Sequence, residues 1–214
     1  MTSATCKRPP KSSSSVGFTV VVDVETEAGL VAGLVSEQSQ RPLVVAVDGA
    51  SAAGTSTLAA AVGRRLSASV VAGDDFYRDM PEARRWALTA AEGVDLYFDW
   101  QRLRKEAIEP LRAGRVARYR PFDWRAGAGL AEQVVEAVPT PVVVVDGVYS
   151  GRPELGDVVD VAVLVETPAA ERRRRMAARG HGNDGWWSRW DAAENLYFAT
   201  VRPASSYDLV VSGM

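Results

Sequence analysis

Cysteine, histidine and lysine are scarce in this chain of 214 residues. The one cysteine, Cys6, lies in a polar N-terminal segment, which excludes an internal disulfide framework and a cysteine-based metal site. The one histidine, His181, argues against a zinc cage of imidazoles and against a Ser-His-Asp triad. Lysine occurs only at Lys7, Lys11 and Lys105, so every other basic residue is an arginine.

A strong net charge and a long apolar run are also missing. The formal net charge is −2, so no basic field indicates a nucleic-acid partner. No apolar run approaches the ~20 residues that a membrane-spanning helix needs. Residues 1–17 lack the apolar segment of a secretory signal. We therefore expect a cytoplasmic protein without a membrane or nucleic-acid partner.

The remaining composition is that of a globular protein, with 47% hydrophobic and 24% charged residues. The length suits one domain with a small lid. Residues 1–17 are rich in Ser, Pro and Lys and are predicted to form a disordered tail. Residues 18–214 are predicted to form the single folded domain.

Short apolar segments alternate with helical patterns along this domain. We expect strands at 18–24, 43–47, 69–72, 141–145, 161–165 and 208–211, and helices at 26–38, 56–66, 81–113 (mainly helical), 169–179 and 186–201. Thr26 is the expected N-cap of the first helix. Most of these strands are continuously apolar, which predicts burial on both faces. The fold class is therefore α/β, with a parallel sheet between two layers of helices.

Acidic residues and glycines recur where the predicted strands end. The pairs are Asp48-Gly49, Asp74-Asp75, Asp146-Gly147 and Glu166-Thr167. Because parallel sheets bind ligands beyond the carboxyl ends of their strands, these pairs indicate a site at one edge of the sheet.

A phosphate-binding loop is the clearest motif at this edge. It comprises Gly49, Ala50, Ser51, Ala52, Ala53, Gly54, Thr55, Ser56 and Thr57. The pattern G-x-x-x-x-G-K-[ST] between a strand and a helix curls backbone N–H groups around phosphate oxygens, and the helix N-terminus adds positive charge. Gly49, Gly54 and Ser56 fit the pattern, and the Ser56 hydroxyl is a candidate Mg²⁺ ligand. Thr55 stands in the lysine position and cannot neutralise a phosphate charge.

Several segments follow one another in a specific order: VVAVDGASAAGTST at 44–57, GDDFYRDM at 73–80, FDWQRL at 98–103, RYRPFDW at 118–124, VVVVDGVYS at 142–150, an arginine-rich helix at 172–179 and RPASSYDLVV at 202–211. Taken together, these segments resemble the uridine kinase-like P-loop kinases, close to small actinobacterial members. The resemblance implies a three-layer P-loop NTPase fold with a five-stranded parallel sheet. It also implies a small lid and acceptor subdomain, inserted at about 76–127 and 172–190.

The resemblance implies roles for residues at the strand ends and in the lid. Asp74 matches the base that accepts the proton of the acceptor hydroxyl, and it can also hold Mg²⁺. Asp146 matches the acid that orients the metal, so Ser56, Asp74 and Asp146 form the expected metal set. Arg172, Arg175 and Arg179 share one helix face and match the lid arginines that reach the triphosphate. The implied cofactors are ATP, or another NTP, and Mg²⁺.

Acceptor-binding residues are implied between the second strand and the third. Asp95 or Asp99 matches the acidic residue that binds the acceptor, with Asp95 the better match. The aromatic residues Tyr77, Tyr119, Phe122 and Trp124 match the region that encloses it. Uridine kinases carry a histidine just after this segment, and this chain has none there, so a uracil-type acceptor does not follow from the resemblance.

Two functions remain open from the sequence. One is an NTP-dependent kinase whose acceptor is a nucleoside, a sugar or a small natural-product hydroxyl. The other is a P-loop protein that binds a nucleotide or a phosphorylated metabolite as a sensor or scaffold, as the missing lysine suggests; replacement of that lysine by design is a third explanation of Thr55. The expected partner is a small molecule, and homo-oligomer formation is left open.

Overall fold

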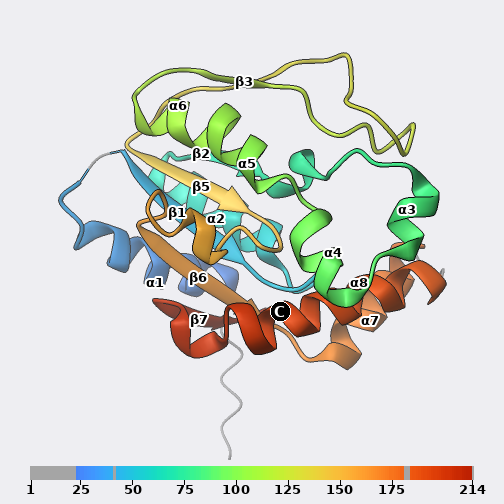
Figure 1. Cartoon of the computed structure of the whole chain (residues 1–214). Helices are drawn as coiled ribbons and strands as arrows, with labels where there is room; N and C mark the ends of the chain where they lie inside the picture. Colours follow the sequence, from blue (N-terminus) through green and yellow to red (C-terminus); the bar gives the residue numbers. More distant parts are fainter. Residues whose placement is uncertain (1–22, 41, 181–183, 214) are drawn as a thin grey trace, which may run out of the picture.

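A parallel sheet of five strands forms the centre of the protein in this computed structural model, which describes residues 23–40, 42–180 and 184–213 (Figure 1). The strands are β1 (Leu43–Asp48), β2 (Ser69–Ala72), β5 (Val142–Asp146), β6 (Val161–Glu166) and β7 (Leu209–Ser212). Their order is β2-β5-β1-β6-β7, and every pairing is parallel. The α/β class with a parallel five-stranded sheet is confirmed.

The register of the central strands brings the strand ends to one edge. Val47 of β1 lies opposite Asp146 of β5, and Ala72 of β2 also lies opposite Asp146. Every residue of β1 and of β5 is buried, because helices cover both faces of the sheet. The turns that follow β1, β2 and β5 therefore meet at this edge, as the sequence predicts.

Helices α1 (Val24–Ser36) and α2 (Thr55–Leu66) pack together and cover one face of the sheet. The N-cap of α1 is Asp23 and not Thr26 as predicted, because the Asp23 carboxylate accepts the Thr26 N–H at 2.9 Å. Val24 belongs to this helix and not to a strand. The rest of the strand predicted at 18–24, the tail at 1–17 and His181 lie outside the described residues.

The stretch predicted as mainly helical, at 81–113, is divided into short pieces, of which those from residue 100 on cover the other face near β2 and β5. The pieces are α3 (Glu82–Ala87), α4 (Ala90–Leu96), α5 (Trp100–Leu103), the π-helical η2 (Arg104–Ile108) and α6 (Glu109–Arg112). Thr89 and Glu92 form a capping box that starts α4, and Asp99 caps α5 through the Arg102 N–H at 3.1 Å. The cap at Thr89 therefore separates α4 from α3, and the cap at Asp99 separates α5 from α4.

Two further parts complete the molecule. A small antiparallel sheet pairs β3 (Ala117–Tyr119) with β4 (Val135–Ala137), and β4 is too short to be predicted from its sequence. Helices α7 (Ala169–Ala178) and α8 (Asp184–Leu196) follow β6, and α8 continues as the π-helical η4 (Tyr197–Val201). Short 3-10 turns are η1 (Gly73–Phe76), η3 (Pro153–Leu155) and η5 (Ala204–Ser206). None of the helices in the described ranges is long and apolar enough to cross a membrane.

Candidate active site

The loop between β1 and α2 has the backbone shape of an anion-binding nest. Ala52 and Gly54 have positive φ values of 63° and 111°, while the Ala53 N–H closes a turn on Ala50 O at 2.9 Å. Such an alternation turns successive N–H groups toward one side, at the start of a helix that adds its dipole. Gly49 is required for space, since a Cβ there would lie 2.7 Å from the carbonyl oxygen of Val165.

Two carboxylates stand beside this loop, that of Asp146, which is buried, and that of Asp74, which keeps solvent-exposed surface. Asp146 ends β5, and Asp74 lies in η1, directly after β2. Burial, then the charges of Asp146 and Asp75, raise the pKa of Asp74 to about 6, while Arg179 acts in the opposite direction. Burial also raises the pKa of Asp146, against the side chains of Ser56 and Thr55, which lower it through hydrogen bonds. Asp146 therefore interacts electrostatically with Asp74 and through hydrogen bonds with the loop residues Ser56 and Thr55.

The donor set at this point fits a magnesium ion. The Oδ1 atom of Asp146 is buried and has no hydrogen-bond partner within the described part of the chain. Ser56 supplies a hydroxyl beside the same carboxylate, and Asp74 supplies a second carboxylate. No group of three His, Cys, Asp or Glu side chains that could hold a metal occurs among the described residues. Mg²⁺ typically takes one or two carboxylates together with water and phosphate oxygens, so this set suffices for it.

A cavity of about 380 Å³ contains the phosphate loop and Asp74, and Asp146 lies directly beside it. It is lined by the loop residues Gly49, Ala50, Ser51, Ala52, Gly54, Thr55, Ser56 and Thr57 and by Asp74, Trp124, Gly147, Val148, Met176, Arg179, Trp186 and Trp190. Of the three predicted lid arginines, Arg179 is the one that lines it. Thr55 fills the position where the P-loop pattern has a lysine, with its methyl group over Gly49 and its hydroxyl toward Asp146.

Arg172 and Arg175 are engaged with the loop from outside this cavity. Arg172 is buried, pairs with Asp191 at 3.0 Å and Glu194 at 3.6 Å, and donates to Ser51 O at 3.4 Å. Arg175 donates to the carbonyl oxygens of Ala52 and Ala53 at 3.1 and 3.2 Å. These two arginines hold the carbonyl side of the loop in this structure.

The predicted aromatic residues divide into a cavity wall and its support. Trp124 is 50% exposed, lines the cavity and donates its indole N–H to Asp74 O at 3.3 Å. Tyr77 is buried and stacks on Trp124, with ring centroids 4.8 Å apart. Phe122 is buried against both rings. Tyr119 lies farther away, where its buried ring packs on Phe76.

The two acidic residues predicted to contact the acceptor do not line this cavity. The Asp95 side chain is 74% exposed and lies 4.0 Å from Arg152. Asp99 caps α5, pairs with Arg78 at 3.5 Å and lines a different cavity of about 430 Å³. The structure therefore brings Trp124 to Asp74, but not Asp95 or Asp99.

Sequence reasoning missed the contribution of α8 to the site. Trp186 and Trp190 stack at 5.2 Å and line the cavity, and Glu194 is fully buried against the loop. A signal for Glu194 exists in the sequence, because Trp190, Ala193, Glu194 and Tyr197 follow the i, i+3, i+4, i+7 spacing of one helix face. A carboxylate within an apolar face needs a buried partner.

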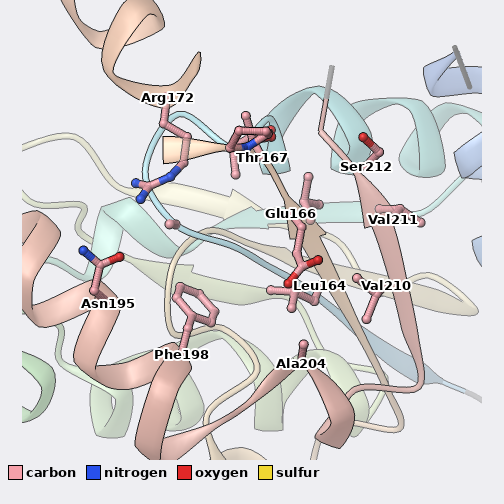
Figure 2. Close-up of a pocket in the computed structure, with 14 residues that line it drawn as sticks. Leu164, Glu166, Thr167, Arg172, Asn195, Phe198, Ala204, Val210, Val211 and Ser212 are labelled. Atoms are coloured by element: carbon pink, nitrogen blue, oxygen red, sulfur yellow. The ribbon is translucent and has the colours of Figure 1, made fainter. Parts of the chain in front are cut away.

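Another cavity, of about 650 Å³, lies between β6, β7 and α8 (Figure 2). Figure 2 shows Arg172 at one end, with Asn195 and Phe198 across from Val210 and Ser212 on β7. It shares Ala50 with the site cavity but contains neither Asp74 nor Asp146. Because neither carboxylate lines it, this cavity does not indicate phosphoryl transfer.

Comparison with known proteins places the fold. No protein-family model matches the chain. A structure from Bacillus stearothermophilus, provisionally described as a uridine kinase, is 20% identical with a TM-score of 0.66, over 85% of this chain and 95% of that one. A structure from Silicibacter sp. TM1040, provisionally described as a fructose transport system kinase, is 26% identical with a TM-score of 0.66, over 86% and 98%. The D-glycerate 3-kinase of Cryptococcus neoformans is 15% identical with a TM-score of 0.59, over 88% and 95%.

The fold is that of P-loop kinases. The three similar structures differ in the acceptors that their descriptions name, so they agree on the scaffold and not on a substrate.

Proposed function

We propose that the protein is a phosphotransferase that moves the γ-phosphoryl group of a nucleoside triphosphate to a hydroxyl group of a small molecule. The observation that supports this most is the meeting of the phosphate loop, Asp74 and Arg179 in one cavity, with Asp146 directly beside it. A loop that only connected a strand to a helix would have no need of a second carboxylate at Asp74 beside the buried carboxylate of Asp146, whose burial is unfavourable.

Each residue has a distinct task in this proposal. The N–H groups of the loop and the N-terminus of α2 hold the phosphates. Ser56 and Asp146 would hold the magnesium ion, with Asp74 close by, and the ion when bound supplies positive charge to the phosphate oxygens. Asp74 accepts the proton of the acceptor hydroxyl as that oxygen takes the phosphoryl group, and the nucleoside diphosphate leaves. Arg179 provides a positive charge in the same cavity.

Thr55 sets the expected rate of this reaction. Loss of one preorganised donor to the transition state typically costs about 10²–10³ in rate. Arg179 is placed to supply part of this charge, because it lines the cavity and acts on Asp74. We therefore infer slow transfer rather than none.

The acceptor is inferred to be a nucleoside, a sugar or a small natural-product alcohol. Trp124 provides a half-exposed ring near Asp74, and aromatic rings of this kind suit planar or sugar-like groups. Asp95 and Asp99 would contact an acceptor only if it extended beyond the cavity that contains Asp74.

A second candidate function is nucleotide binding without transfer. The observation in its favour is that Arg172 and Arg175, which would otherwise reach the triphosphate, are bound to the carbonyl groups of Ser51, Ala52 and Ala53. In this alternative the loop binds a nucleotide or a phosphorylated metabolite and Asp74 serves no acceptor.

Two measurements test and separate these functions. Mg·ATP, Mg·GTP and Mg·ADP at 100 times their dissociation constants should raise the free energy of unfolding by about 2.7 kcal/mol, visible as a thermal shift. A panel of neutral alcohol acceptors is then screened for NDP release above the hydrolysis background. Binding with acceptor-dependent release supports the phosphotransferase, binding with no release from any acceptor supports the binding protein, and the absence of any thermal shift contradicts both.

A further inference from the structure

Every polar group of one loop residue, Ser51, is bound by helices α7 and α8. The Ser51 N–H donates to Glu194 Oε2 at 2.9 Å, and its hydroxyl donates to Glu194 Oε1. The Trp190 indole N–H donates to Ser51 Oγ at 2.8 Å, and Arg172 donates to the Ser51 carbonyl oxygen at 3.4 Å. Ser51 is thus the point where α8 is joined to the phosphate loop.

The direction of these hydrogen bonds follows from the chemistry of the groups. An indole N–H can only donate, so the Ser51 oxygen is the acceptor from Trp190 and its own hydrogen is directed to Glu194. Each carboxylate oxygen of Glu194 therefore receives one hydrogen from Ser51. An ionised carboxylate satisfies both donors, whereas a side-chain amide would direct N–H groups toward one of them.

The surroundings of Glu194 balance its charge against complete burial. Glu194 is 0% exposed. The charged and titratable groups that face it are Arg172 of α7, at 3.6 Å, and Tyr149, which follows β5; Asp191 of α8 shares Arg172. Burial raises the pKa of Glu194 to about 7, against the hydrogen bonds from Ser51 and the charge of Arg172.

Ser51, which α7 and α8 bind through these hydrogen bonds, directly precedes the anion-binding turn of the phosphate loop. Ser51 is followed by Ala52, whose positive φ sets the direction of the next N–H groups, and Arg175 fixes the carbonyl groups of Ala52 and Ala53. We propose that Glu194 is a positioning residue that holds the phosphate loop in its anion-binding shape through Ser51, so that α8 controls the affinity for nucleotide. The affinity part of this inference rests on the proposed function, but the control of loop shape does not.

Two readouts separate the two parts. Hydrogen exchange of residues 49–57 in the free protein reports the loop without any ligand, and calorimetric titration with Mg·ADP reports affinity. Glu194→Gln should speed exchange in this segment by at least about tenfold and raise the dissociation constant by at least about tenfold at pH 8. The ratio of the dissociation constants of variant and wild type should be smaller at pH 6, because a pKa of about 7 leaves Glu194 of the wild type mostly protonated there.

Further variants keep the inference testable. Ser51→Ala, which retains the backbone N–H contact, should give a smaller change in both readouts, and it also serves if Glu194→Gln does not fold. Ser188→Ala is the control on α8, because Ser188 is exposed and its hydroxyl donates to Gly185 O of the same helix, so exchange of residues 49–57 in this variant should match the wild type. Unchanged exchange in Glu194→Gln and Ser51→Ala, or equal changes in Ser188→Ala, would overturn the inference. If the wild type binds no Mg·ADP while exchange responds as expected, the proposed function fails and the positioning role stands.

Discussion

The hydroxyl of Tyr119 donates a hydrogen bond of 3.2 Å to Asp75, which therefore takes a direction different from that of its neighbour Asp74. The two aspartates lie in the 3-10 turn η1, not in an extended strand end, yet only Asp74 lines the site cavity. Asp75 is engaged with Tyr119 and lies near Arg102. Adjacent residues with the same side chain thus have different environments, and each can serve as the control for the other.

Asp74→Asn should lower phosphoryl transfer by roughly 10²–10⁴, because it removes the proton acceptor while keeping the shape of the side chain. The dissociation constant for nucleotide should change little, since the loop provides most of the binding. The measurement is single-turnover transfer to an acceptor identified by the panel. Asp75→Asn is the matched control and should reduce transfer far less. Equal losses in the two variants would show that Asp74 is not the base, and weaker nucleotide binding with unaltered turnover would assign Asp74 to the metal.

Gly49→Ala should destabilise the protein and abolish nucleotide binding. The added Cβ would lie 2.7 Å from Val165 O and 2.9 Å from the Thr55 methyl group, so the loop would have to move. Overpacking of this kind typically costs about 1–3 kcal/mol of the free energy of unfolding.

Gly33→Ala is the control, because the added Cβ would meet nothing within 4 Å and Gly33 lies within α1. That change should instead raise the free energy of unfolding by roughly 0.5–1 kcal/mol. Urea unfolding of both variants measures the two effects, and a loss of similar size in each would contradict the steric argument.

Thr55→Lys should increase the rate of transfer. The new ammonium group would lie near two carboxylates, Asp74 and Asp146, and near the phosphates of a bound nucleotide, where it stabilises negative charge. The gain is expected to be up to about 10²–10³, the usual value of one such donor. Thr200→Lys adds the same charge at an exposed position on η4 and should leave the rate unchanged. An unchanged rate in Thr55→Lys would mean that the arginines already supply this charge or that the site does not transfer phosphate.

The sheet and the phosphate loop could be predicted because their signals are local. Continuous apolar strands, the glycines of the loop and the acids at strand ends all lie within short segments.

Asp48 shows what a local signal cannot predict. It ends β1 just as Asp146 ends β5, but it is fully buried and accepts hydrogen bonds from the hydroxyls of Tyr197 and Tyr207 and from three backbone N–H groups. Its role is structural, and its partners are too distant in sequence for the strand-end pattern to reveal them.

The roles of the arginines were equally beyond the sequence. Helical spacing places Arg172, Arg175 and Arg179 on one face, but it does not show what that face meets. The first two meet loop carbonyls and acidic residues of α7 and α8, and the third faces the cavity. Tertiary partners decide which of three similar side chains remains available to a ligand.

Arg179→Gln should move the acid limb of the pH–rate profile to higher pH. The Arg179 guanidinium favours the ionised form of Asp74 and so lowers a pKa that burial and Asp146 have raised to about 6. Without this charge the pKa of Asp74 rises further. Because the base must be ionised to accept a proton, the rate at a pH near 6 should fall more than the rate at pH 8. The measurement is kcat/KM for the acceptor between pH 5 and 9.

Arg175→Gln is the matched control, since Arg175 contacts the carbonyl groups of Ala52 and Ala53 and is not among the groups that shift the pKa of Asp74. It should weaken nucleotide binding without moving the acid limb. An acid limb at the same pH in Arg179→Gln and the wild type would show that Arg179 does not act on the base, and a loss of rate equal at every pH would assign Arg179 to the phosphates alone.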